Sequence, residues 1–109
     1  MNSFDDREKA FEAKFQHDQE MQFRIQNRRN KLLGLWAAEL LSLTGEAADA
    51  YAKEVVMADF DEPGDEDVFR KVQGDLAGKN VDISEHRIRR QMEELMGTAR
   101  QQIMTEAKP

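Results

Sequence analysis

Apolar residues recur every three or four positions along most of this chain, the pattern of amphipathic helices. The strongest runs predict four helices, near residues 20–43, 46–60, 66–77 and 84–104. No stretch alternates apolar and polar residues for long enough to indicate a strand, and no internal repeat is found. We therefore predict an all-α fold, with a four-helix bundle formed by residues 19–109.

Each predicted helix has an apolar stripe that we expect to face the core. In the first helix these residues are Leu32, Trp36, Leu40 and Leu43, with Leu33, Ala37 and Leu41 beside them. In the second helix they are Ala48, Tyr51, Ala52, Val55 and Val56. In the third they are Val68, Phe69, Val72 and Leu76, and in the fourth Ile88, Met92, Leu95, Ala99 and Ile103. We place Trp36 in the core. We expect Gly45 to end the first helix, and Ser84 to cap the last.

Residues 1–18 differ from the rest because their large apolar side chains are few and mostly aromatic. Phe4, Phe11 and Phe15 are spaced seven and four residues apart, so a helix would place them on one face. An isolated helix of this length is only marginally stable in water. Two interpretations stay open: the segment extends the first helix and packs on its own bundle, or it is mobile and folds on binding another protein.

Composition and charge narrow the classes of function. The 109 residues include no cysteine, which excludes disulfides and thiolate chemistry. The net charge is −6, and residues 32–83 carry twelve of the 22 acidic side chains, which argues against nucleic-acid binding. The longest apolar run, residues 32–41, is short and interrupted by Glu39, so we expect no membrane span. With no secretory signal visible, we expect a soluble, cytoplasmic protein.

Residues 59–70 partly match a calcium-binding loop. Asp59, Asp61 and Gly64 stand at matching positions, but Arg70 replaces the bidentate glutamate and Pro63 another ligand. We therefore expect a solvated acidic loop with helix-capping aspartates, and no metal site.

The only basic cluster consists of Arg24, Arg28, Arg29 and Lys31. On a helix, these side chains could hold a phosphate or an acidic partner surface. They could equally form a solvated face that pairs with the acidic 59–67 loop of the same fold. No metal-ligand spacing, phosphate-binding loop or nucleophile motif is present, so we predict no enzymatic activity and no catalytic residues.

Five stretches occur in order between Phe4 and Arg90: FDDREKAFEAKF, RRNKLLGLWAAELL, AYAKEVV, GDEDVFRKV and VDISEHRIRR. Together they resemble the zeta subunit of the alphaproteobacterial F-type ATP synthase. This resemblance implies a four-helix bundle with a mobile N-terminal segment, residues 1–18, that inhibits ATP hydrolysis by entering the catalytic sector. The partner-binding residues that it implies are Phe4, Asp5, Asp6, Arg7, Glu8, Lys9, Phe11, Glu12, Lys14 and Phe15.

The resemblance also implies a partner and a location. The partner is the catalytic sector of the synthase, and the chain is peripheral to the inner membrane only through that complex. Members of the family have been associated with weak adenine-nucleotide binding, but no motif here locates such a site, and we predict no resident cofactor. We expect a monomer when the chain is free, with no nucleic-acid partner and no direct membrane insertion. The alternative is a small helical protein- or nucleotide-binding module unrelated to the synthase.

Overall fold

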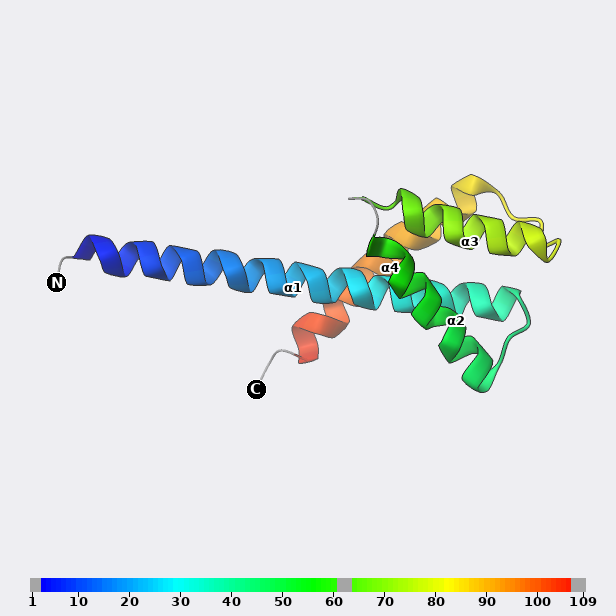
Figure 1. The fold of residues 1–109 in the computed structure, drawn as a ribbon, viewed down its shortest axis with the longest axis horizontal. Coiled ribbons are helices and arrows are strands. Elements are labelled where there is room, and N and C mark those ends of the chain that lie inside the picture. Colours follow the sequence, from blue (N-terminus) through cyan, green and yellow to red (C-terminus); the bar gives the residue numbers. More distant parts are fainter. Residues whose placement is uncertain (1–2, 61–63, 107–109) are drawn as a thin grey trace.

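The computed structural model describes the backbone of residues 3–60 and 64–106, and the side chains of residues 16–59 and 64–106. Its helices are α1 (Ser3–Leu40), α2 (Gly45–Met57), α3 (Glu66–Gly78) and α4 (Glu85–Glu106), and a short 3-10 helix, η1 (Ala58–Phe60), follows α2. No strand occurs among the described residues (Figure 1). The prediction of an all-α, four-helix fold is confirmed.

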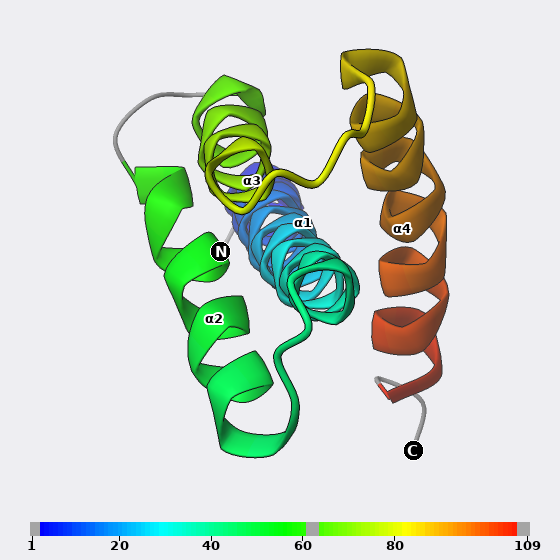
Figure 2. The ribbon, with the colours of Figure 1, turned by 90° about the vertical axis from the view of Figure 1, so that its right-hand side faces the viewer.

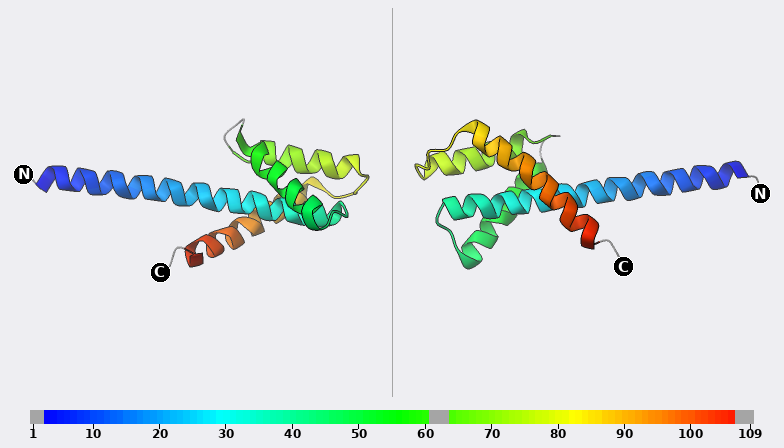
Figure 3. Two further views of the ribbon diagram at one scale, coloured as in Figure 1. Left: turned by 60° about the horizontal axis from the view of Figure 1, so that its bottom comes forward. Right: turned by 180° about the vertical axis from the view of Figure 1, so that it is seen from behind.

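Helix α1 is the central element of the bundle. Viewed along its axis, α2 and α4 lie on its two sides and α3 lies above it (Figure 2). These three helices surround only the C-terminal half of α1, and the N-terminal half extends beyond them (Figures 1 and 3). The molecule is therefore elongated, with extents of 65 × 29 × 21 Å.

The first helix begins much earlier than residue 20, the start that periodicity predicted. It is continuous from Ser3 to Leu40. Residues 3–33 contain no glycine or proline and are rich in strong helix formers, so nothing in this stretch interrupts the helix. The apolar pattern is blurred before Ile25, but the backbone there is helical.

The main core unites all four helices. Its buried members are Leu33, Ala37, Ala38, Tyr51, Val55, Val68, Phe69, Val72, Leu76, Ile88 and Met92. The predicted stripes of the third and fourth helices are confirmed, with Leu95 only partly buried. In α1 the expectation was partly wrong: Trp36 is only partly buried at the edge of the core, and Leu40 is 37% exposed. The buried line runs instead through Leu33 and Ala37.

A second, smaller cluster joins α4 to the middle of α1. Ile25, Ala99 and Ile103 are buried there. Met21, the N-terminal-most residue packed on this cluster, is partly buried. Residues 16–20 are all exposed. Among the described side chains of α1, burial therefore begins at about Met21.

The end of α1 differs from the prediction. Ser42 adopts a left-handed φ of 63°, and the N–H of Leu43 donates to the carbonyl of Ala38 at 2.8 Å. This six-to-one bond is typical of a Schellman motif. The expectation that Gly45 ends the helix was wrong: α1 ends at Leu40, and Gly45 is the first residue of α2.

The start of α4 agrees with the prediction. The Oγ of Ser84 accepts a hydrogen bond from the N–H of Arg87 at 3.1 Å, as an N-cap does. In contrast, Asp65 occupies the N-cap position of α3 without a side-chain capping bond. Its carboxylate binds Arg29 instead.

Gly34 permits the close crossing of α1 and α2. A Cβ atom at this position would lie 2.6 Å from Cα of Ala52 and 3.3 Å from Cβ of Val55. The nearest obstacle is backbone, which cannot rotate away as a long side chain can. The crossing at Gly34 thus fixes how closely the two helices approach.

We expect Gly34→Ala to lower the free energy of unfolding by about 1–3 kcal/mol, because α1 and α2 must move apart. Gly74→Ala and Gly97→Ala are matched controls, since an added Cβ meets no atom within 4 Å at either helical position. Each control should stabilise the protein by about 0.5–1 kcal/mol through helix propensity. Urea denaturation of the three variants measures both effects, and equal behaviour of all three would contradict the close crossing.

Candidate partner-binding site

The N-terminal segment is the first part of α1. Its backbone is helical from Ser3 and continues in line with the rest of the helix, clear of α2, α3 and α4 (Figures 1 and 3). The backbone of the segment therefore continues the first helix and does not fold back onto the bundle. The ten residues assigned to partner contact, Phe4–Lys9, Phe11, Glu12, Lys14 and Phe15, all lie on this stretch. Their side chains are outside the described residues, so that assignment stays a prediction.

A buried polar cluster lies near the base of this segment. Arg29 and Asn30 are 1% and 0% exposed. The Nε–H of Arg29 donates to Oδ1 of Asn30 at 2.7 Å, and its Nη2–H donates to Oδ1 of Asp65 at 2.6 Å. A buried guanidinium is tolerated only when such bonds replace its lost hydration. Arg29 therefore joins α1 to the start of α3.

Asp59 extends the same cluster to η1. Its Oδ2 accepts from Nδ2 of Asn30 and from Nε2 of Gln26, both at 2.9 Å. Residues 26–30 of α1 are thus bonded to two separate points of the acidic 59–67 loop. The interpretation that the basic cluster pairs with this loop within the fold is confirmed for Arg29, but Arg29 is buried and is not part of a solvated face.

These bonds also bear on the calcium-like pattern of the loop. Asp59 and Asp65 are directed to side-chain donors of α1 rather than to a shared centre. Among residues 16–59 and 64–106, no group of three or more His, Cys, Asp or Glu side chains could hold a metal ion. Asp61 and Pro63 lie outside the described residues, and the absence of calcium binding stays a prediction.

Sequence reasoning missed the role of Asn30 and Gln26. One signal was present: Arg29 lies four residues after Ile25 and four before Leu33, so it shares their buried stripe. A cation inside an apolar stripe predicts a buried pair. The partner could not be named, because Asp65 is distant in sequence.

Arg28 connects α1 to the end of α4. Its Nη1–H donates to Oε1 of Gln102 at 2.8 Å, and its guanidinium pairs with the carboxylate of Glu106 at 2.8 and 3.0 Å. The hydrogen bond from Arg28 holds the pKa of Glu106 below its ordinary value. The last turn of α4 is thereby attached beside the point where α1 leaves the bundle.

The basic cluster is divided by the fold. Arg28 and Arg29 are used within the bundle, whereas Arg24 and Lys31 are exposed and form no ion pair with any described residue. Within the described ranges, no helix is both long enough and apolar enough to cross a membrane.

Comparison with known proteins decides the family. A family model described as ATPase inhibitor subunit zeta matches residues 1–102. The chain belongs to this family. The match includes both the N-terminal segment and nearly all of the bundle. The resemblance identified in the sequence is confirmed.

A solved structure supports the fold. A solution NMR structure is 55% identical in sequence and superimposes with a TM-score of 0.71. The similarity covers 79% of this chain and 98% of that chain. No curated protein sequence matches this chain significantly.

We expect Arg29→Ala to lower the free energy of unfolding by at least about 2 kcal/mol, because Asn30 loses its buried donor and Asp65 its partner. The neighbouring Arg28→Ala is the matched control. Its salt bridge is partly exposed, so its loss should cost about 1 kcal/mol or less. Chemical denaturation of both variants tests this order, and an equal cost would contradict the buried role of Arg29.

The Arg28–Glu106 pair predicts a pH effect. Because the pKa of Glu106 is lowered in the folded state, the stability it contributes is present above its unfolded pKa and is lost as pH falls through the folded value. NMR titration of the Glu106 carboxyl should give a pKa below the ordinary range, and Arg28→Gln should return it toward that range. Arg90→Gln, which removes a partner of Glu94 instead, should leave it unchanged.

Proposed function

We propose that this chain is an inhibitory subunit of the F-type ATP synthase, and that its N-terminal segment binds as a helix in the catalytic sector and blocks ATP hydrolysis. Membership of the ATPase inhibitor subunit zeta family supports an inhibitory role and association with the synthase. The observation that carries the proposed mechanism is the continuity of α1 from the bundle into a projecting segment. On this proposal the chain is a regulatory protein, not an enzyme, and meets the inner membrane only through the synthase, on its cytoplasmic side.

The dimensions of the molecule suit this mechanism. Residues 3–18 as a helix span about 24 Å, with a diameter of about 10–12 Å including side chains. The molecule measures 29 and 21 Å across its two shorter axes, a width set by the bundle rather than by the single helix. A cleft between subunits that accepts the segment would exclude the bundle, which would stop further entry.

The composition of the segment suits an interface between proteins. Phe4, Phe11 and Phe15 would enter apolar pockets of the catalytic sector as anchors. The charged residues between them would pair with the partner around the rim of the contact. These residues are Asp5, Asp6, Arg7, Glu8, Lys9, Glu12 and Lys14.

The fold lowers the cost of ordering the segment. In the free protein we propose that residues 1–18 are mobile, because a short helix without packing is marginally stable. The packed half of α1 already supplies a helical nucleus, so binding needs only to propagate the helix toward the N-terminus. Family resemblance adds a direction: rotation for hydrolysis would trap the bound helix, and rotation for synthesis would expel it.

We expect Phe11→Ala and Phe15→Ala each to raise the inhibition constant for ATP hydrolysis by about thirtyfold, which corresponds to about 2 kcal/mol for a central anchor. Thermal unfolding midpoints should barely change, because the anchors pack against the partner and not against the bundle. Lys9→Ala and Lys14→Ala should act more weakly, and mainly at low salt, if these groups lie at the rim.

Leu40→Ala is a suitable control for this series. Leu40 is a partly exposed apolar residue at the opposite end of α1, so its removal should leave the inhibition constant unchanged. The proposed mechanism is wrong if the phenylalanine variants inhibit normally, or if they inhibit poorly only because the bundle melts.

A further inference from the structure

Two open grooves lie side by side where α1 meets α2 and α4. The first, of about 580 Å³, is lined by residues of α1 and α2: Lys31, Asp49, Ala52, Lys53, Val56 and Met57. The second, of about 360 Å³, is lined by Arg24, Asn27, Arg28, Lys31, Val56 and Ile103. Both grooves include Lys31 and Val56, so they form one surface that crosses α1 from α2 toward α4. We call this surface the basic face; its cations are Arg28, which is paired with Glu106, and the exposed Arg24, Lys31 and Lys53.

Three of the four cations on the basic face are exposed. Arg24, Lys31 and Lys53 form no hydrogen bond or ion pair with any described residue, although the chain has a net charge of −6. Arg24 is near enough to Glu106 to help lower its pKa, but Glu106 is paired with Arg28. An acidic chain thus leaves three exposed cations together on one surface.

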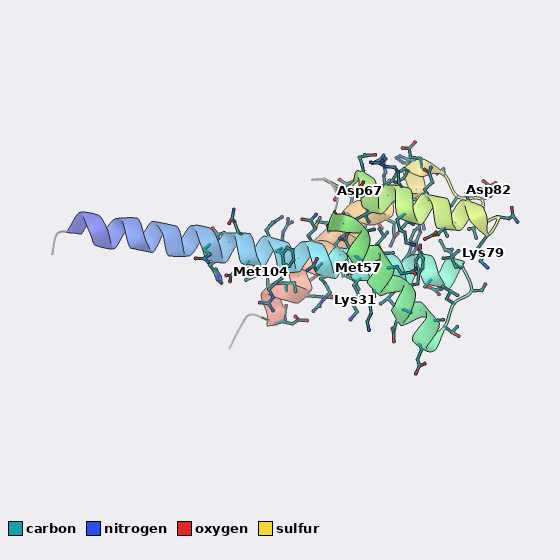
Figure 4. All side chains as sticks on the ribbon, in the orientation of Figure 1. Lys31, Met57, Asp67, Lys79, Asp82 and Met104 are labelled. Carbon is teal, nitrogen blue, oxygen red and sulfur yellow. The ribbon has the colours of Figure 1, made fainter. Side chains whose placement is uncertain are left out.

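Exposed apolar atoms accompany these cations. Met57 is 65% exposed beside Lys31, and both side chains lie where α1 and α2 cross (Figure 4). Methionine and arginine are both enriched at protein interfaces relative to the rest of the protein surface.

We propose that the basic face binds a carboxylate-bearing, partly apolar surface of the same catalytic sector that receives the N-terminal segment. This inference rests on the proposed function. Arg24 lies six residues, or about 9 Å along the helix, beyond residue 18. A partner that encloses the segment therefore comes next to Arg24, and the contact continues onto the groove beside Lys31.

The spacing of the cations favours a protein surface over a single bound anion. The cations come from two helices and from separate turns, and Asp49 lines the larger groove with them. An extended surface with several carboxylates can pair with cations that are spread in this way. Such a contact would speed association by electrostatic steering and would set the depth at which the segment stops.

The test compares two triple charge reversals in the full-length chain. The first is Arg24→Glu, Lys31→Glu and Lys53→Glu. The matched control is Lys79→Glu, Arg87→Glu and Arg100→Glu, which reverses three other exposed cations. These line neither groove and have no ion pair among the described residues. Both variants change the net charge equally. Binding to purified catalytic sector is measured as Kd at low and high salt, with ATP hydrolysis followed in parallel.

We expect the basic-face variant to bind at least about tenfold more weakly at low salt, with most of the salt dependence lost. The control should change Kd by less than about threefold. Equal losses in the two variants, or none in the first, would overturn the inference. If the first variant has lost its helix signal in circular dichroism, the milder triple variant Arg24→Gln, Lys31→Gln and Lys53→Gln replaces it. Its Kd is then measured at low and high salt and judged by the same criteria.

The two readouts separate this inference from the proposed function. Wild-type protein that binds without inhibiting would contradict the proposed function, while the two Kd values would still decide the role of the basic face. Absence of wild-type binding would overturn both. Binding through the basic face to phosphatidylglycerol vesicles but not to the catalytic sector would assign the face to an anionic membrane surface and overturn the inference.

Discussion

Arg29 imposes the constraint on which the arrangement of this bundle depends. A guanidinium that is 1% exposed has lost its hydration and must be paired inside the protein. Its bonds to Asn30 and Asp65, with the bonds of Asn30 and Gln26 to Asp59, attach the middle of α1 to η1 and to the start of α3. Apolar packing has little direction, whereas these bonds fix the position of the acidic loop on α1.

The same helix belongs to the bundle and to the projecting segment. Residues 26–30 are held by the polar cluster, and Ile25 packs against α4, so the direction in which α1 leaves the bundle is set within one or two turns of its exit. A projecting helix held in this way has a rigid base. In the proposed mechanism, this base would resist the load on the segment while the width of the bundle limits its entry.

Charge is divided between internal and external uses. Arg28 and Arg29 neutralise Glu106 and Asp65, whereas Arg24 and Lys31 remain available on the surface. From the sequence these four residues formed one cluster with two open interpretations. Arg29 pairs with the acidic loop, as one interpretation held, and binding of a partner by the outward residues stays a proposal. Helical spacing alone does not separate the two groups, because the outcome depends on which side of α1 the other helices cover.

The sequence by itself determined the helical class, the number of helices, the buried residues of α3 and α4, the cap at Ser84, and the family. These follow from local spacing and local hydrogen bonding, which depend on residues close together in the chain. Tertiary structure alone decided which apolar stripe of α1 is fully buried. Leu33 and Ala37 are fully buried, whereas Trp36 is partly buried and Leu40 is exposed. Both stripes are apolar, and the close crossing at Gly34 selects between them. It also decided that Arg29 pairs with Asp65, because a partner 36 residues away is chosen by packing and not by periodicity.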